Sequence, residues 1–197
     1  MTAGPPPQDW LGRKLLILGD VNAGKTTFTR AILEAFCRQG LGPRVAVLDL
    51  APEIPAELAE RRGLPGVGGG LVPPAGAGAL YLRDRLEPPR LSSTSGAEAL
   101  RKAEHNRLAI DRLLQDAELA RRDIVFANDV TLYLQAGSAA TLLERLGHAT
   151  TLVVNGYWGD RLGSGELSRR ERAETAKLLA WFEAAGTVMN LPLPVAG

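Results

Sequence analysis

The chain has 197 residues, of which 45% are hydrophobic, and its formal net charge is +1. This length is enough to bury one sizeable core, and the near balance of charge argues against a strongly basic nucleic-acid-binding domain. A lone cysteine, Cys37, cannot form an internal disulfide, and no apolar run approaches the roughly 20 residues of a membrane span. We therefore expect one cytoplasmic domain without a membrane partner.

The first eleven residues hold several prolines and lack the apolar stretch of a signal peptide. We expect residues 1–11 to be a disordered leader and residues 12–197 to be a single domain. Within that domain, residues 63–78 contain seven glycines and three prolines. This composition predicts a long loop, either a mobile lid, a partner-binding loop or a low-complexity segment.

Residues 14–38 combine a buried strand, a phosphate-binding loop and a helix. Residues 14–18 form a short apolar run, and residues 27–38 carry apolar side chains at helical spacing. The segment between them matches the pattern G-x-x-x-x-G-K-[ST] in full. Its residues are Gly19, Asp20, Val21, Asn22, Ala23, Gly24, Lys25 and Thr26. Glycine lets the backbone fold around a phosphate, and backbone N–H groups then point at the anion from the start of the helix.

The polar side chains of this loop predict nucleotide binding. Lys25 places a charge near the β- and γ-phosphates, Thr26 places a hydroxyl where Mg²⁺ binds, and Thr27 continues the nucleotide-binding segment. Only four of the 23 basic residues are lysines, so the lysine at position 25 stands out. A compact ammonium fits where a planar guanidinium would crowd the loop. We expect a nucleoside triphosphate, ATP or GTP, with Mg²⁺ as cofactor.

The remaining chain alternates strands and helices. Strands are expected at residues 44–50, 79–82, 123–127, 150–154 and 187–189, and residues 87–91 are expected to be extended. Helices are expected at residues 54–62, 96–122, 139–146 and 171–185, the last after a capping box at residues 168–171. This order predicts an α/β protein with a three-layer P-loop NTPase fold, in which helices cover both faces of a mostly parallel sheet.

Ligands bind at the carboxyl ends of the strands in such a sheet. Asp49 ends an apolar run, where a carboxylate holds Mg²⁺ directly or through water, orients a nucleophile or simply caps the next turn. Glu53, four residues further on, is a weaker candidate for a base. Asn128 and Asp129 follow another strand, and Asp129 is either a ligand to a Mg²⁺-bound water, a γ-phosphate sensor or part of an ordinary turn.

A late strand ends at Asn155, which we include among the nucleotide-binding candidates. P-loop GTPases read guanine at such a position with an Asn-Lys-x-Asp motif. Here Gly156 follows Asn155 and no aspartate has the matching spacing, so guanine specificity is unsupported. Tyr157 and Trp158 either stack on a base or pack on the surface of the domain.

Residues 19–30, with the segment Gly-Lys-Thr-Thr-Phe-Thr-Arg, and residues 47–50 resemble the P-loop domain of the RNA 5′-hydroxyl polynucleotide kinases. That family belongs to the SIMIBI class of P-loop NTPases, and the resemblance covers roughly residues 14–53, with a looser resemblance at residues 88–91 and 126–137. If the protein is a kinase, the loop at residues 63–78 and the segment 87–96 are the candidates for its acceptor pocket. It implies phosphoryl transfer to a nucleic-acid or nucleoside hydroxyl. The family pattern has a second aspartate where this chain has Ala51, and Asp20 replaces a lysine that marks the partitioning ATPases.

Two functions follow as hypotheses. In the first, the protein hydrolyses or transfers the γ-phosphoryl group: Lys25 stabilises charge, Thr26 and Asp49 hold Mg²⁺, and Asp129 or Glu53 positions the nucleophile. In the second, it is a nucleotide-gated adaptor or switch with slow turnover, serving a partner protein or the assembly of a metallocentre. The oligomeric state is not specified by these features.

Overall fold

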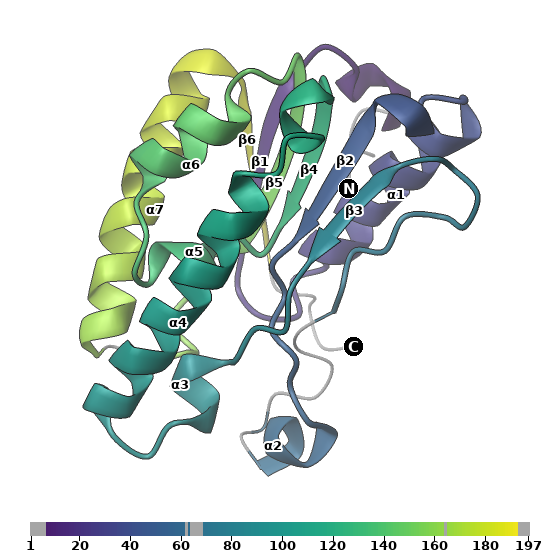
Figure 1. Cartoon of the computed structure of the whole chain (residues 1–197). Helices are drawn as coiled ribbons and strands as arrows, with labels where there is room; N and C mark the ends of the chain where they lie inside the picture. Colours follow the sequence, from purple (N-terminus) through teal and green to yellow (C-terminus); the bar gives the residue numbers. More distant parts are fainter. Residues whose placement is uncertain (1–6, 62, 64–68, 164, 193–197) are drawn as a thin grey trace.

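The protein is described by a computed structural model over residues 7–61, 63, 69–163 and 165–192 (Figure 1). At its centre lies a parallel sheet with the strand order β3-β2-β4-β5-β1-β6. The strands are β1 (Lys14–Gly19), β2 (Val45–Asp49), β3 (Leu80–Arg83), β4 (Ile124–Asn128), β5 (Thr151–Tyr157) and β6 (Thr187–Leu191). The expected α/β class with a parallel sheet is confirmed.

Helices cover both faces of this sheet, as expected (Figure 1). On one face lie α1 (Lys25–Arg38) and the 3-10 helix η1 (Pro7–Trp10). On the other lie α4 (Gly96–Leu114), α5 (Thr131–Leu134), α6 (Ala139–Leu146) and α7 (Glu166–Ala185). The short helices α2 (Ala56–Arg61) and α3 (Pro89–Ser92) lie beyond the carboxyl ends of the strands, and η2 (Gly42–Arg44) and η3 (Leu119–Arg121) are single turns.

The core follows from the alternation of side chains along each strand. Leu15 and Ile17 of β1 face α1, where Phe36 is also fully buried, whereas Leu16 and Leu18 face the layer of α4 and α7. Successive strand residues point to opposite faces, so a strand covered on both faces must be apolar throughout. The continuous apolar runs in the sequence have this cause.

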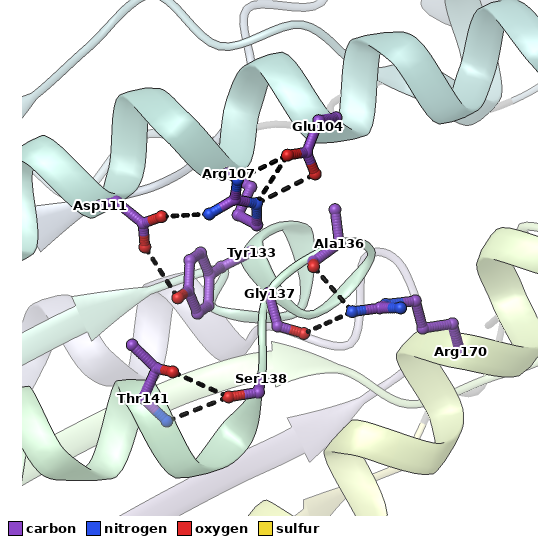
Figure 2. A network of polar contacts seen from close by, with 9 residues as sticks. All are labelled: Glu104, Arg107, Asp111, Tyr133, Ala136, Gly137, Ser138, Thr141 and Arg170. Carbon is purple, nitrogen blue, oxygen red and sulfur yellow. Dashed lines mark hydrogen bonds and ion pairs between the residues drawn. The ribbon is translucent and has the colours of Figure 1, made fainter.

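A polar network joins the four helices of the second face (Figure 2). On α4, Arg107 binds both Glu104 and Asp111. Asp111 in turn accepts a hydrogen bond from the hydroxyl of Tyr133 on α5, at 2.9 Å. Arg170 of α7 donates to the carbonyl oxygen of Ala136, which precedes α6, at 2.8 Å. These contacts fix α5 between its neighbours.

Two segments near the ends of the sheet differ from the expectation. The leader is ordered from Pro7, because Trp10 is buried against α1 with 3% of its surface exposed, while residues 1–6 lie outside the described residues. Residues 87–91, expected to be extended, include the start of α3. Pro89 stands in the first turn of that helix, where the missing N–H of proline costs nothing.

Two helices also have other bounds than expected. The helix from residue 96 ends at Leu114, because the side chain of Asp116 accepts from two following backbone N–H groups and so competes with the helix. Helix α7 begins at Glu166 rather than 171, so the capping box is wrong. Glu171 instead lies inside the helix with its side chain buried.

Candidate functional site

The phosphate-binding sequence forms the turn between β1 and α1. Gly19 ends the strand, and a Cβ there would lie 2.8 Å from the carbonyl oxygen of Leu191. Gly24 precedes the helix with a φ of +82°, a left-handed conformation that favours glycine. Both glycines of the pattern are therefore needed for the shape of the turn.

Lys25 lies folded against this turn. Its Nζ donates a hydrogen bond to the carbonyl oxygen of Asp20 at 2.6 Å. Burial lowers the pKa of Lys25, and the nearby carboxylates of Asp129 and Asp20 oppose that effect. The ammonium is thus desolvated and faces a carboxylate across the cavity, which makes it a strong partner for an anion.

A chain of hydrogen bonds runs from the P-loop into the sheet. Thr26 Oγ1 donates to Asn128 Oδ1 at 3.3 Å, and Asn128 Nδ2 donates to Asp49 Oδ1 at 2.8 Å. Strands β4 and β5 lie between β2 and β1, which places the ends of β2 and β1 about 14 Å apart at the usual strand spacing. Asp49 therefore reaches Thr26 only through Asn128.

Asp49 is fully buried and its second oxygen is also engaged. Oδ2 accepts from the backbone N–H of Leu71 at 3.1 Å and from the hydroxyl of Tyr81 at 3.0 Å, with Arg83 Nη1 at 3.9 Å. Asp49 is absent from the described residues that line the cavity above the P-loop. In the described part of the chain Asn128 links this carboxylate to Thr26, and the role of Asp49 toward Mg²⁺, directly or through water, stays a prediction.

Glu53 lies further from the P-loop. Its side chain is 52% exposed and forms ion pairs with Arg83 and Arg85, each at 3.6 Å. Among the described residues it is not part of the cavity lining. The structure does not bring this second base candidate to the phosphate-binding turn.

Asp129 faces the cavity that Lys25 lines. It is half-buried and adopts a φ of +56°, in the left-handed region that non-glycine residues rarely occupy. Its N–H donates to Asn155 Oδ1 at 2.9 Å, and its Oδ1 accepts from the Thr131 hydroxyl at 3.2 Å. Burial raises the pKa of Asp129, and Lys25 opposes that rise. Unusual backbone conformations of this kind cluster at functional sites.

The side-chain amide of Asn155 makes three hydrogen bonds within the site. Its Nδ2 donates to Thr29 Oγ1 and to Asn128 Oδ1, both at 2.9 Å, while its Oδ1 holds the backbone of Asp129. The amide thus ties α1 to the end of β4. Tyr157 is 8% exposed, and Trp158 is half-buried with the Arg172 guanidinium 5.0 Å from its ring, so both aromatic residues pack against the domain.

The cavity has a volume of about 340 Å³. One end is formed by the P-loop and α1, including Asn22, Lys25 and Thr26. The other end is formed by the segment around α3 and by α5, including Arg90 and Gln135. Arg90 lies in the segment 87–96, a predicted candidate for the acceptor pocket. The sequence-based interpretation did not identify Gln135 or the adjoining Glu171 as site residues, because they meet Arg90 only through the tertiary fold.

These three side chains form a buried polar cluster. Arg90 donates two hydrogen bonds to Glu171, at 3.0 Å and 2.8 Å, and Gln135 Nε2 donates to the same carboxylate at 2.8 Å. Burial raises the pKa of Glu171 to about 7, although Arg90 acts to lower it. The guanidinium also lies 5.3 Å from the centre of the Tyr157 ring.

The donor set beside the P-loop fits magnesium. Thr26 supplies a hydroxyl and Asp129 a carboxylate to the lining of the cavity, and Mg²⁺ prefers such oxygen ligands together with substrate phosphates. In the described part of the chain no group of three or more His, Cys, Asp or Glu residues has the geometry of a protein-only metal site. This arrangement matches an ion that arrives with a nucleotide.

No protein-family model matches the chain, and no curated protein matches it. Among solved structures, the chain is similar to the Pif1 helicase from Candida albicans, with 12% identity and a TM-score of 0.34. The similarity covers 98% of this chain but 40% of the helicase chain, so the chain spans less than half the length of that protein. A likeness this weak carries no argument about function.

The chain has a P-loop NTPase fold, on the strength of its parallel sheet and of the turn formed by residues 19–26. The resemblance to the polynucleotide kinases and to the SIMIBI class is not tested by these comparisons and stays a prediction. Among the described residues, none of the helices has the length and apolar character needed to cross a bilayer.

Proposed function

We propose that the protein binds a nucleoside triphosphate with Mg²⁺ and hydrolyses or transfers its γ-phosphoryl group. One observation carries the proposal: Lys25, Thr26 and Asp129 line the same cavity above a complete phosphate-binding turn. A turn of this sequence alone would predict phosphate binding. The carboxylate across from Lys25 adds a group that acts on a nucleophile.

Phosphate binding uses the backbone and Lys25. Helix α1 begins directly after the turn, and the N–H groups of its first turn and its dipole favour an anion there. A bound phosphate replaces the carbonyl oxygen of Asp20 as the partner of Lys25 Nζ. The desolvated ammonium then stabilises negative charge on the transferring group.

Thr26 would hold Mg²⁺ together with the phosphate oxygens of the nucleotide. When bound, this ion neutralises charge on the phosphate oxygens. Asp49 and Asn155 orient Asn128 by hydrogen bonds of 2.8 Å and 2.9 Å, so its amide oxygen is presented toward Thr26. Asp49 thus orients Asn128 and does not itself line the described cavity.

Asp129 positions the nucleophile. Burial raises the pKa of Asp129, which makes its carboxylate a stronger base. The nucleophile, a water or an acceptor hydroxyl, gives its proton to Asp129 and forms a bond to the γ-phosphorus. The bond to the bridging oxygen breaks and a nucleoside diphosphate leaves.

A nucleotide-gated switch is a second candidate, favoured by the segment Gly69–Leu71. This segment lies against the site: Asn128 donates to the carbonyl of Gly69, Arg30 of α1 donates to the carbonyl of Gly70, and Leu71 donates to Asp49. Movement of Thr26 toward a metal-bound nucleotide would release Asn128 and so loosen the end of the Gly/Pro-rich loop. A partner protein that binds this loop would sense the nucleotide.

Thermal unfolding with Mg·ATP and Mg·GTP tests nucleotide binding directly. A ligand at a hundred times its dissociation constant adds roughly 2.7 kcal/mol to the free energy of unfolding. We expect Lys25→Ala to lose that stabilisation and the exposed Lys177→Ala to keep it, since Lys177 pairs with Glu174 on the surface of α7. Equal stabilisation of both variants would contradict the proposal.

A further inference from the structure

The end of the cavity remote from the P-loop contains a buried amide oxygen without a partner. Gln135 is 2% exposed, and its Oε1 has no hydrogen-bond partner in the part of the chain that the structure describes. Its Nε2 donates to Glu171 at 2.8 Å, which directs Oε1 away from that side chain. An unsatisfied buried acceptor costs about 1–3 kcal/mol, so its retention calls for an explanation.

The positively charged side chain at the same end is paired with a buried carboxyl group. Among the described residues that line the cavity around α3 and α5, the cation is Arg90. Its guanidinium is already bound by both oxygens of Glu171. The pair is 13% and 4% exposed, so solvent does not screen or replace it readily. A ligand with its own phosphate would find no free positive charge here, whereas the P-loop end offers Lys25 and the turn.

The walls between these polar groups are apolar. They suit a ring or short carbon skeleton of the size of a sugar or nucleoside. The apolar residues that line this part of the cavity are Pro88, Pro89, Leu91, Leu132 and Leu162.

A short chain of contacts connects the two ends of the cavity. The Thr131 hydroxyl donates to Asp129 at 3.2 Å and accepts from the backbone N–H of Tyr157 at 3.0 Å. The ring of Tyr157 in turn lies beneath Arg90. A ligand seated against Gln135 therefore has Asp129 as its neighbour on the side of the P-loop, where the γ-phosphate is expected.

We propose that this end of the cavity is an acceptor subsite for a neutral, polyhydroxylated small molecule, a nucleoside or a sugar. One hydroxyl of the acceptor donates a hydrogen bond to Gln135 Oε1, and a second faces Asp129. This inference rests on the proposed function and narrows it to phosphoryl transfer. It departs from the polynucleotide acceptor that the family resemblance implies, because a phosphodiester backbone is bound through free cations.

The reaction balances as a simple transfer. The acceptor oxygen forms a bond to the γ-phosphorus, and the bond from that phosphorus to the bridging oxygen of the nucleotide breaks. The hydroxyl proton passes to the carboxylate of Asp129. The products are the phosphorylated acceptor and a nucleoside diphosphate.

The test measures transfer from γ-labelled ATP or GTP, with Mg²⁺, to a panel of ribonucleosides and simple sugars and to an RNA with a 5′-hydroxyl. We expect a nucleoside or a sugar to be labelled. Gln135→Leu, which removes both amide groups at similar volume, should raise KM for that acceptor at least tenfold with a smaller change in kcat. The exposed Gln115→Leu serves as the matched control and should leave KM unchanged.

A second measurement does not depend on the variant folding. In the wild-type protein saturated with Mg·ADP, the labelled acceptor should raise the melting temperature further. Labelling of the RNA alone, or release of phosphate without any labelled acceptor, would overturn the subsite while the proposed nucleotide binding stands. Absence of any stabilisation by nucleotide would overturn both.

Discussion

The two ends of the cavity are built in opposite ways. The P-loop end comes from one contiguous segment, residues 19–27, whose backbone makes most of the site. The far end comes from side chains on separate helices, with Arg90 and Glu171 81 positions apart and Gln135 and Glu171 36 positions apart. A site made of backbone groups can be predicted from a local sequence motif. A site made of paired side chains forms only when the helices that carry them pack together.

The largest expected effect on stability lies at the far end. Glu171→Ala leaves the guanidinium of Arg90 buried without its partner, and we expect a loss of about 3–5 kcal/mol in the free energy of unfolding. The double variant Arg90→Met, Glu171→Leu removes both charges, so it should lose much less. Urea unfolding of the wild type and these variants compares them, and equal losses would show that the pair is not the cause.

The pH dependence of stability distinguishes the two ends as well. The pKa of Glu171 is raised in the folded state from its ordinary 4.5 to about 7, so its protonated form is favoured by folding. This contribution is complete below pH 4.5 and is lost as the pH rises to about 7, a decrease of about 3 kcal/mol.

Urea unfolding at pH 4.5 and pH 7.5 measures that decrease, with Glu171→Gln as the comparison because it cannot titrate. We expect the glutamine variant to lack the extra decrease between the two pH values. A variant with the wild-type pH dependence would place the buried titrating group elsewhere.

A smaller effect is expected away from both ends, in the network of Figure 2. Tyr133→Phe removes a hydrogen bond of 2.9 Å to the carboxylate of Asp111, which should cost about 1.5–3 kcal/mol. Nucleotide affinity should not change, because Tyr133 contacts neither end of the cavity. A change in the dissociation constant for Mg·ATP would indicate that α5 transmits strain to the site.

The smallest effect is expected at the surface of the same network. Glu104→Gln breaks an ion pair with Arg107 in which the glutamate side chain is 51% exposed. Exposed pairs contribute about 0–1 kcal/mol, so the midpoint of urea unfolding should hardly move. A loss as large as that of Glu171→Ala would remove the distinction between a buried and an exposed pair.

The sequence was sufficient for the P-loop, its helix and the parallel sheet, because each depends on a local pattern. The order of the strands does not follow from such a pattern. Asp49 ends one apolar strand and Asp129 directly follows another, and the insertion of β4 and β5 between β2 and β1 separates Asp49 from Thr26. Local sequence also could not place Glu53. It is close to Asp49 in the sequence, but in the fold it pairs with Arg83 and Arg85 at the surface.

The missed residues have one physical reason in common. Glu171 fits the spacing of a capping box, yet burial turns it toward Arg90, and no local rule weighs one partner against the other. Trp10 lies in a proline-rich segment whose composition indicates disorder, although a single buried indole anchors its last turn. In both cases tertiary contacts override the local preference.

The most direct test of the proposed function is the rate of γ-phosphoryl loss from saturating Mg·nucleotide in Asp129→Asn and Glu53→Gln. Both changes replace a carboxylate by an amide of similar shape, but only Asp129 lines the cavity with Lys25. General base catalysis contributes typically 10²–10⁴-fold, so Asp129→Asn should lower the rate about a hundredfold or more, while Glu53→Gln stays within about twofold. Turnover that survives in Asp129→Asn, or is lost in Glu53→Gln, would contradict the assignment of Asp129 as the residue that positions the nucleophile.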